Sequence, residues 1–357
     1  MQKIDIGGRT VGKGEPVFII AEAGINHNGS LEAALQLIEV ASSAGCDAVK
    51  FQKRNPRKLL SQEAYDRPYQ NGGNSYGKTY GEHRENLELS KEDYRTLQAY
   101  ARKKGILFCA SAWDEDSASF LGQIDIPFHK IGSPDLTNLP LCRKIAQMGK
   151  PMILSTGMSH LDEVVRAVES IRAINPNLAL LHCVSIYPTP PEKLCLRLIP
   201  ALESQFDLPV GYSGHDLGWD ASIAAVALGA CIVEKHITLD RTQKGGDHHF
   251  SLEPDELSAM VHGIRGIEKA LQSAEKVVWP EELPFREKLS KSITTTRKIE
   301  SGEKITPDMV TCKSPGTGIS PLDMDELIGS ELSENVGGDV VLRGAEVKKN
   351  RKTGRSA

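Results

Sequence analysis

The chain of 357 residues is 39% hydrophobic and 25% charged, a composition typical of globular proteins with a large buried core. Its net charge of −4 gives no electrostatic reason to expect nucleic acid or a membrane surface as a partner. No apolar run reaches the ~20 residues of a transmembrane helix, and the polar N-terminus lacks the apolar core of a signal peptide. The seven cysteines include no CxxC pair and are typical of buried thiols, so we expect a cytoplasmic protein.

Short apolar runs alternate with amphipathic stretches from Val17 to about Ser273. Eight such strand–helix units favour an α/β fold, a (β/α)8 TIM barrel, over an open doubly wound sheet. No GxGxxG fingerprint follows the first strand, which argues against a dinucleotide-binding domain. The predicted strands are residues 17–21, 48–51, 107–110, 128–131, 152–154, 179–183, 210–212 and 231–234. The predicted helices are residues 31–44, 91–104, 116–123, 139–147, 162–173, 192–203, 220–228 and 254–270.

Two parts of the chain depart from this alternation. Residues 54–89 contain RPYQNGGNSYGKTYGEH, a connection long enough for a functional lid, although a disordered insertion would have the same composition. Its tyrosines and Lys78 suit an anion or a sugar. After residue 273, short strands and turns predict a small, mostly β domain, with domains at residues 1–280 and 281–350. Such a domain is too small to bury much core alone, so it must dock on its own barrel or on a neighbour's.

The stretch from Val210 to Asp240 is the most informative, because two successive strands end in His215 and His236. In a parallel barrel these ends share one mouth, so the pair suits a divalent metal such as Mn²⁺, Mg²⁺, Co²⁺ or Zn²⁺. Two hydrogen-bonded structural histidines would give the same pattern. Lys235 should point away from His236, since side chains alternate along a strand. His248 and His249 follow in a glycine-rich loop, which more often shapes a sugar pocket than supplies ligands.

Polar residues follow the other predicted strands as well. Lysines, serines and threonines that converge on one barrel mouth describe a phosphate or carboxylate site. One of these residues, His27, has two interpretations: it contacts substrate, or it fixes its loop. The full set is Glu22, Asn26, His27, Asn28, Lys50, Gln52, Ser111, Lys130, Ser133, Asp135, Ser155, Thr156, Ser185, Tyr187 and Ser213.

These residues lie in motifs that resemble a known family. The motifs AEAGINHNGS, KFQK, HKIGSPD, ILSTGM, HCVSIYPTP, GYSGHD, EKHITLD and GGDHHFSLEPDEL are similar to those of the N-acetylneuraminate (sialic acid) synthases, from about Val17 to Gly344. Members of that family condense phosphoenolpyruvate with an N-acylmannosamine. The resemblance implies a barrel followed by a C-terminal antifreeze-like (SAF) domain, which is exchanged across a homodimer to cap the partner's active site.

The resemblance also implies roles for individual residues. His215 and His236 would hold a divalent metal, Mn²⁺ or Mg²⁺, which polarises the sugar aldehyde. Glu22 matches an active-site carboxylate, Asp135 matches an acidic residue proposed to activate water, and we also expect Ser213 to contact substrate. Phosphoenolpyruvate would contact Lys50, Ser111, Lys130, Ser133, Ser155 and Ser185. The amino sugar would contact Gln52, Tyr187 and Asp247.

Two departures from the family pattern concern the sugar. Many bacterial members carry KRPG in the C-terminal domain, where the arginine contacts the acyl group, but this chain has Ser314 at that position. The connection around Lys78 looks like that of animal enzymes, which use the 6-phosphorylated sugar, and this resemblance implies that Lys78 and the nearby tyrosines contact the phosphate. The sequence therefore leaves both the free and the phosphorylated sugar open.

The sequence is also compatible with three rival interpretations. A related nonulosonate synthase, such as a legionaminate synthase, would share every motif. A Schiff-base aldolase would use Lys50 or Lys130 as its nucleophile. A sugar-binding or structural protein on a barrel scaffold is the third, and the complete set of polar strand ends argues against it.

Overall fold

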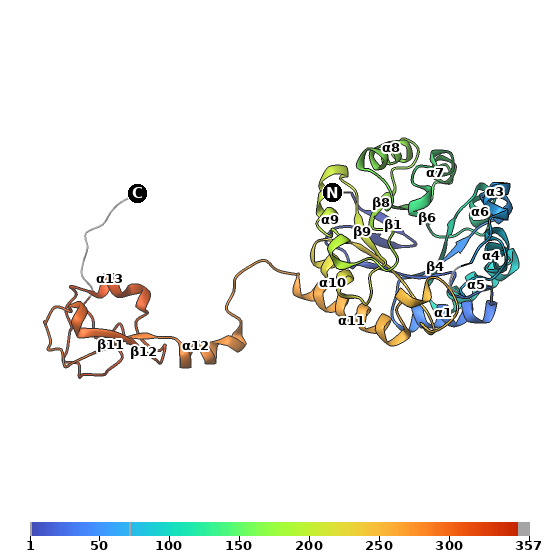
Figure 1. The fold of residues 1–357 in the computed structure, drawn as a ribbon. Helices are drawn as coiled ribbons and strands as arrows, with labels where there is room; N and C mark the ends of the chain where they lie inside the picture. The colour runs from blue at the N-terminus through green and yellow to red at the C-terminus, as the bar shows by residue number, and fades with distance from the viewer. Residues whose placement is uncertain (1, 71–72, 349–357) are drawn as a thin grey trace. The chain divides into compact units, whose positions relative to one another are not determined.

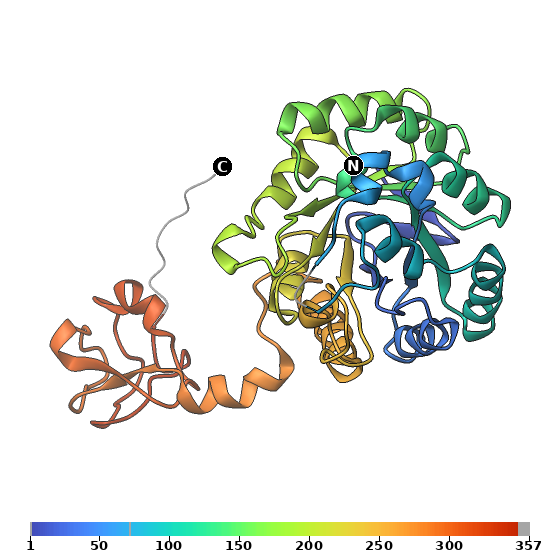
Figure 2. The same ribbon diagram turned by 45° about the vertical axis from the view of Figure 1, so that its right-hand side comes forward.

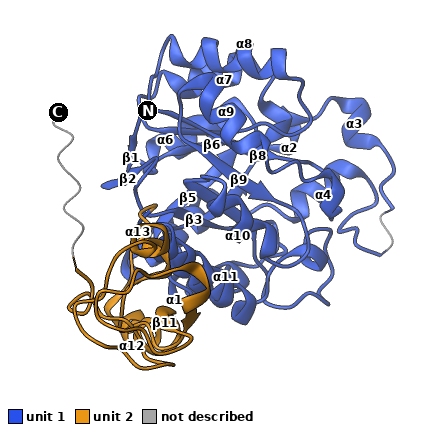
Figure 3. Ribbon diagram, turned by 90° about the vertical axis from the view of Figure 1, so that its left-hand side faces the viewer, with its two compact units in different colours: residues 1–273 blue, residues 274–357 orange. Residues whose placement is uncertain are grey.

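The computed structural model describes residues 2–70 and 73–348, which fall into two compact units, Met1–Ser273 and Ala274–Ala357 (Figure 3). The sequence-based boundary lay at residue 280. The predicted end of the second domain, residue 350, lies outside the described residues. None of the helices in the described ranges is long and apolar enough to cross a membrane.

The first unit is a closed barrel of eight parallel strands, which confirms the predicted fold (Figures 1 and 2). Neighbouring strands follow chain order, and the barrel closes where the last strand pairs with the first. The strands are β3 (Phe18–Gly24), β4 (Ala48–Lys53), β5 (Leu107–Ala112), β6 (His129–Ile131), β7 (Met152–Ser155), β8 (Leu178–Cys183), β9 (Val210–Gly214) and β10 (Ile232–His236).

Helices form a ring outside the strands (Figures 1 and 2). Their starts follow from local sequence: Ser30 and Ser90 cap two N-termini by accepting a backbone N–H. The prediction of one helix over residues 192–203 is wrong. Residue Cys195 has φ +49°, which interrupts the helix between the 3₁₀ turn Pro191–Lys193 and α9. The helices are α1 (Leu31–Ser43), α5 (Lys91–Lys104), α6 (Glu115–Gln123), α7 (Leu139–Ala146), α8 (Leu161–Arg172), α9 (Leu198–Phe206), α10 (Asp220–Ala227) and α11 (Pro254–Ala270).

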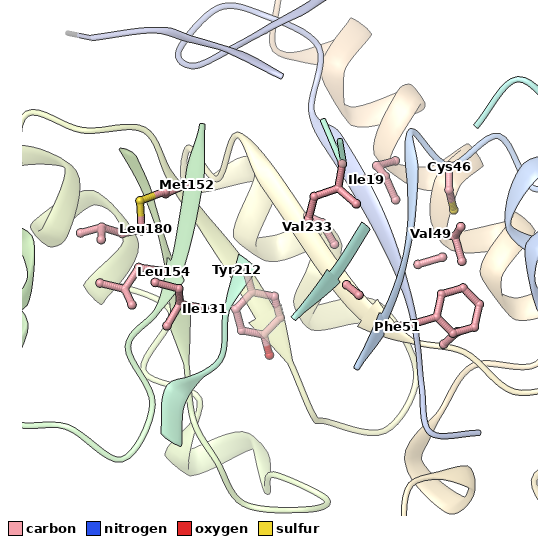
Figure 4. Close-up of a cluster of buried hydrophobic side chains, with 14 of the residues drawn as sticks. Ile19, Cys46, Val49, Phe51, Ile131, Met152, Leu154, Leu180, Tyr212 and Val233 are labelled. Atoms are coloured by element: carbon pink, nitrogen blue, oxygen red, sulfur yellow. The ribbon is translucent and has the colours of Figure 1, made fainter. Parts of the chain in front are cut away.

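The strands divide their side chains between two environments, because successive residues point to opposite faces. Outward residues such as Ile19, Val49 and Val233 pack against the helices in one large apolar cluster (Figure 4). Inward residues are apolar only in the N-terminal half of the barrel. A hairpin that the sequence did not predict, β1 (Ile4–Ile6) with β2 (Arg9–Val11), packs in this inner cluster and closes that end. The C-terminal half of the interior is left for polar side chains.

The connection over residues 54–89 contains three short helices, α2 (Pro56–Leu59), α3 (Gln62–Asp66) and α4 (Tyr80–Asn86). It is tied to the loop that follows β10. The Tyr76 hydroxyl donates to the Lys244 carbonyl at 2.7 Å, and the Gly245 N–H donates to Asn74 Oδ1 at 3.2 Å. These bonds hold the connection at the C-terminal end of the barrel.

The second unit is mostly irregular and β, as predicted. Its regular elements are α12 (Leu283–Leu289), β11 (Ser292–Thr295), β12 (Val310–Lys313) and α13 (Met324–Leu327). β11 and β12 pair antiparallel. The unit has a small apolar core of its own around Ile293, Ile299, Ile305, Leu332 and Leu342.

Candidate active site

A cavity of about 500 Å³ opens at the C-terminal ends of the barrel strands. Most predicted site residues line it: Glu22, Lys50, Gln52, Ser111, Lys130, Ser133, Ser155, Tyr187, Ser213, His215, His236 and Asp247. The structure therefore brings twelve residues from all eight strands and their loops into one place.

Strand register explains this convergence. Glu22 of β3 lies level with His236 of β10 on one side and with Lys50 of β4 on the other. Ser111 of β5 lies level with Lys130 of β6. Residues at one level of parallel strands that also point inward must meet inside the barrel.

The inner part of the cavity holds two lysines and two glutamates. Lys50 Nζ lies 2.6 Å from Glu22 Oε2, and Glu234 Oε1 lies 3.7 Å from Lys50 Nζ and 3.6 Å from Lys130 Nζ. Burial alone would lower the pKa of Lys50, but the two carboxylates outweigh it and hold the pKa above its ordinary value. Burial lowers the pKa of Lys130, whose ammonium donates to Ser155 Oγ at 2.7 Å. The serine hydroxyls complete a set of donors suited to an anion.

Ser133 and Ser185 face the space beside Gly157, in the turn after β7. The Gly157 N–H donates to Ser133 Oγ at 3.0 Å. A Cβ on Gly157 would come within 2.7 Å of Ser133 Oγ and 2.4 Å of Ser185 Oγ, so only glycine leaves this space open. Ser185 itself lines a neighbouring cavity rather than the main one.

The two strand-end histidines face each other, with ring centroids 5.3 Å apart. His215 Nδ1 bonds to the Val184 carbonyl at 3.0 Å, the arrangement that leaves Nε2 of a metal-binding histidine exposed to the ion. Burial, with the charges of His215 and Lys50, holds the pKa of His236 far below its ordinary value, so its imidazole is neutral. His236 Nδ1 is buried without a hydrogen-bond partner within the described ranges and lies 3.9 Å from Asp247 Oδ2.

These donors fit a divalent cation. Neutral imidazoles are good ligands, and the buried Nδ1 of His236 is otherwise unsatisfied. Across residues 2–70 and 73–348, no ready-made group of three or more His, Cys, Asp or Glu side chains could hold a metal ion. An ion on His215 and His236 would therefore take its remaining ligands from water and substrate oxygen atoms.

The other histidines separate into structural and exposed ones. His248 is buried and bonds to Thr238 Oγ1 at 2.7 Å, whereas His249 lines the cavity. His27 is buried; its Nδ1 accepts the Gly29 N–H at 3.1 Å and its ring also bonds to the Gly24 backbone. Both nitrogens of His27 are thus used within its own loop, which supports the loop-fixing interpretation.

Besides Ser185, two predicted site residues, Asp135 and Lys78, do not line the cavity. Asp135 is buried behind Ser133, where its carboxylate accepts the Asn138 amide at 3.1 Å, and burial raises its pKa. Lys78 is exposed to solvent. Lys235 points outward, as expected, and pairs with Asp216 at 3.0 Å.

Sequence reasoning missed several lining residues. Glu234 could have been found, because it lies two residues before His236 on the same strand and therefore on the same face. No strand periodicity could have indicated that Arg84 lines the cavity. It comes from the long connection, together with Tyr69, Asn74 and His83.

Comparison with known proteins places this architecture in a family. A model described as the NeuB family matches residues 37–276, more than half of the chain, and a SAF domain model matches residues 290–348. The chain belongs to the NeuB family.

Relatives of this NeuB-family chain have several named activities. It is 44% identical over 327 residues to human N-acetylneuraminate-9-phosphate synthase, covering 91% of each chain. It is 38% identical over 330 residues to N,N'-diacetyllegionaminic acid synthase of Legionella pneumophila, covering 91% of this chain and 93% of that one. The solved N-acetylneuraminic acid synthetase of Leptospira borgpetersenii, in complex with citrate, superposes with a TM-score of 0.70 at 34% identity, covering 81% of this chain and 97% of that one.

Proposed function

We propose that this enzyme condenses phosphoenolpyruvate with an N-acylmannosamine-type sugar to form a sialic acid or its 9-phosphate. The observation that carries the proposal is the single cavity in which buried Lys50 and Lys130 lie beside His215 and His236. Lysines with serine hydroxyls suit an anionic donor, and paired histidines suit a metal that activates a carbonyl. The named activity of the human relative supports the same reaction.

A bound cation would improve the match between the charges of the inner cavity and this donor. Lys50 and Lys130 are offset by Glu22 and Glu234, so these four residues together carry no net charge. Phosphoenolpyruvate brings a phosphate and a carboxylate. His215 and His236 would hold Mn²⁺ or Mg²⁺, which would act as a Lewis acid on the sugar's aldehyde oxygen.

The proposed reaction forms a carbon–carbon bond first and breaks the bond to phosphate last. The enol carbon of phosphoenolpyruvate forms a bond to the aldehyde carbon, and the aldehyde oxygen takes up a proton. Water adds to the resulting cationic carbon and loses one proton to a carboxylate. The tetrahedral carbon then expels phosphate by C–O cleavage, while its new hydroxyl gives up its proton to the departing phosphate and becomes the ketone oxygen. Glu22 and Glu234 are the carboxylates among the lining lysines, whereas Asp135 lies behind Ser133. Gln52, Tyr187 and Asp247 would contact the sugar.

We also propose that the enzyme works as a homodimer. The segment before β11 exposes large apolar side chains: Trp279 is 60% exposed, Leu283 54% and Phe285 65%. Large apolar side chains exposed in one short segment suit a surface that a second copy of the chain covers. A Phe285→Ser, Leu283→Ser variant should elute as a monomer in size-exclusion chromatography with light scattering, whereas a wild-type monomer would contradict the proposal.

One assay tests the reaction. Phosphate release from phosphoenolpyruvate is measured with N-acetylmannosamine, its 6-phosphate and a 2,4-diamino-dideoxy analogue; the last tests the legionaminate alternative that the Legionella relative raises. Phosphoenolpyruvate labelled with ¹⁸O in its bridging oxygen should deliver the label to phosphate, because the C–O bond breaks. Activity with none of the three sugars would overturn the proposal. Inactivation by borohydride with substrate would favour a Schiff-base aldolase instead.

A further inference from the structure

Arg84 differs from the other cations around the cavity. Lys50 and Lys130, the other two lysine or arginine side chains of the lining, each lie within ion-pair distance of a glutamate. Arg84 lines the cavity from α4, and the structure describes no carboxylate in an ion pair with it. Its Nε and Nη2 atoms donate to the Tyr80 hydroxyl at 2.9 and 2.6 Å, which fixes the guanidinium without neutralising it. A fixed, unneutralised guanidinium is suited to an oxyanion.

Two uncharged donors lie in the same part of the lining. Burial, with the charge of Arg84, lowers the pKa of His83 to about 4, so its ring is neutral at pH 7. His83 Nδ1 accepts the Tyr76 N–H at 3.1 Å, which leaves the ring proton on Nε2 as a donor. Asn74 Oδ1 accepts the Gly245 N–H, which leaves its NH₂ group free to donate.

Asp247 is a carboxylate that also lines the cavity. It interacts with Arg84 electrostatically, but the described residues include no ion pair between the two. Asp247 lies next to His236, on the side of the cavity where the sugar would react. The cavity thus has cationic side chains in two regions, Lys50 and Lys130 in one and Arg84 in the other.

We propose that Arg84, with Asn74 and His83, binds a phosphate group on the sugar, so that the substrate is an acylamino-hexose 6-phosphate. This rests on the proposed function, because a phosphate remote from the reacting aldehyde needs its own site. It assigns to Arg84 the role that sequence reasoning gave to Lys78, which is exposed outside the lining. Both the donor phosphate and the sugar phosphate then find positive charge in one cavity.

The test compares kcat/KM for N-acetylmannosamine and for its 6-phosphate in wild type, Arg84→Ala and Arg84→Lys. Wild type should prefer the phosphorylated sugar. Arg84→Ala should lower kcat/KM for the phosphorylated sugar by roughly 10- to 100-fold, the range for a hydrogen bond to a charged group. The same variant should change kcat/KM for the free sugar less than threefold. Arg84→Lys should restore part of the loss, since it keeps the charge but not the planar fork. Arg67→Ala is the matched control, because it removes an exposed positive charge from the same connection.

The outcomes separate this inference from the proposed function. Turnover of neither sugar by wild type would remove the proposed function. Equal turnover of both sugars, equal losses on both in Arg84→Ala, or a loss confined to Lys78→Ala would overturn the phosphate site alone. Wild type also offers a test that needs no variant: glucitol 6-phosphate should inhibit at least tenfold more strongly than glucitol. Equal inhibition by the two would overturn the site even if Arg84→Ala failed to fold.

Discussion

Lys50 Nζ lies 2.6 Å from Glu22 Oε2, and both side chains are almost completely removed from solvent. Each of these charges is tolerated in the barrel because the other is present, since a lone buried charge is strongly destabilising. The pair therefore contributes to the fold and to the cavity at once. Changes to it should affect both.

We predict that Lys50→Met abolishes turnover and lowers the free energy of unfolding by about 3–5 kcal/mol, because it leaves Glu22 and Glu234 without a shared cation. Urea unfolding followed by circular dichroism measures this. The matched control is Lys144→Met, whose pair with Glu115 is exposed and should contribute no more than about 1 kcal/mol. Equal losses in the two variants would contradict the prediction.

We predict that His215→Ala and His236→Ala each weaken Mn²⁺ binding at least tenfold in isothermal titration calorimetry, since each removes one of two protein ligands. EDTA treatment of wild type should abolish turnover, and added Mn²⁺ or Mg²⁺ should restore it. The control is His262→Ala, an exposed histidine on α11. Full activity after EDTA treatment would exclude the metal.

We predict that the loop after β3 is destabilised by acid. Burial, with the charges of Arg54 and Lys53, lowers the pKa of His27 to about 4 from 6.5. Because the pKa of His27 is lower in the folded state than in the unfolded state, the neutral imidazole contributes its full stabilisation above pH 6.5. This contribution to the free energy of unfolding, up to about 3 kcal/mol, is lost as the pH falls toward 4. Thermal melts of wild type and His27→Gln between pH 7.5 and 4.5 measure this. The variant should start less stable but fall less steeply, and parallel curves would contradict the assignment.

We predict that Asp135→Asn stabilises the fold at pH 7. Burial raises the pKa of Asp135. The protonated carboxyl therefore contributes its full stabilisation below pH 3.8, and this contribution is lost as the pH rises through the pKa of the folded state. The amide keeps the bond from Asn138. The gain at pH 7 should shrink toward pH 4 in urea titrations. Turnover of the same variant decides whether Asp135 activates water, because full activity would leave that role to Glu22 or Glu234.

The barrel could be predicted from local pattern because each of its strands carries its own signal. A buried strand needs apolar residues on the helix-facing side wherever it lies in the chain, so the alternation is visible without tertiary knowledge. The same alternation turned Lys50, Ser111 and Lys130 inward. It also applied to Glu234, which was overlooked beside the more conspicuous His236. The β1–β2 hairpin was missed because two three-residue strands carry too little pattern.

The sequence by itself determined which residues end the strands, and therefore which chemistry gathers at the barrel mouth. Only the tertiary structure decided how these residues are paired: Glu22 with Lys50, and Glu234 between the two lysines. It also decided which cation of the long connection faces the cavity, Arg84 rather than Lys78. The reason is physical. Strand periodicity is a local property, whereas the path of residues 54–89 depends on contacts with residues 244 and 245, more than 150 positions away.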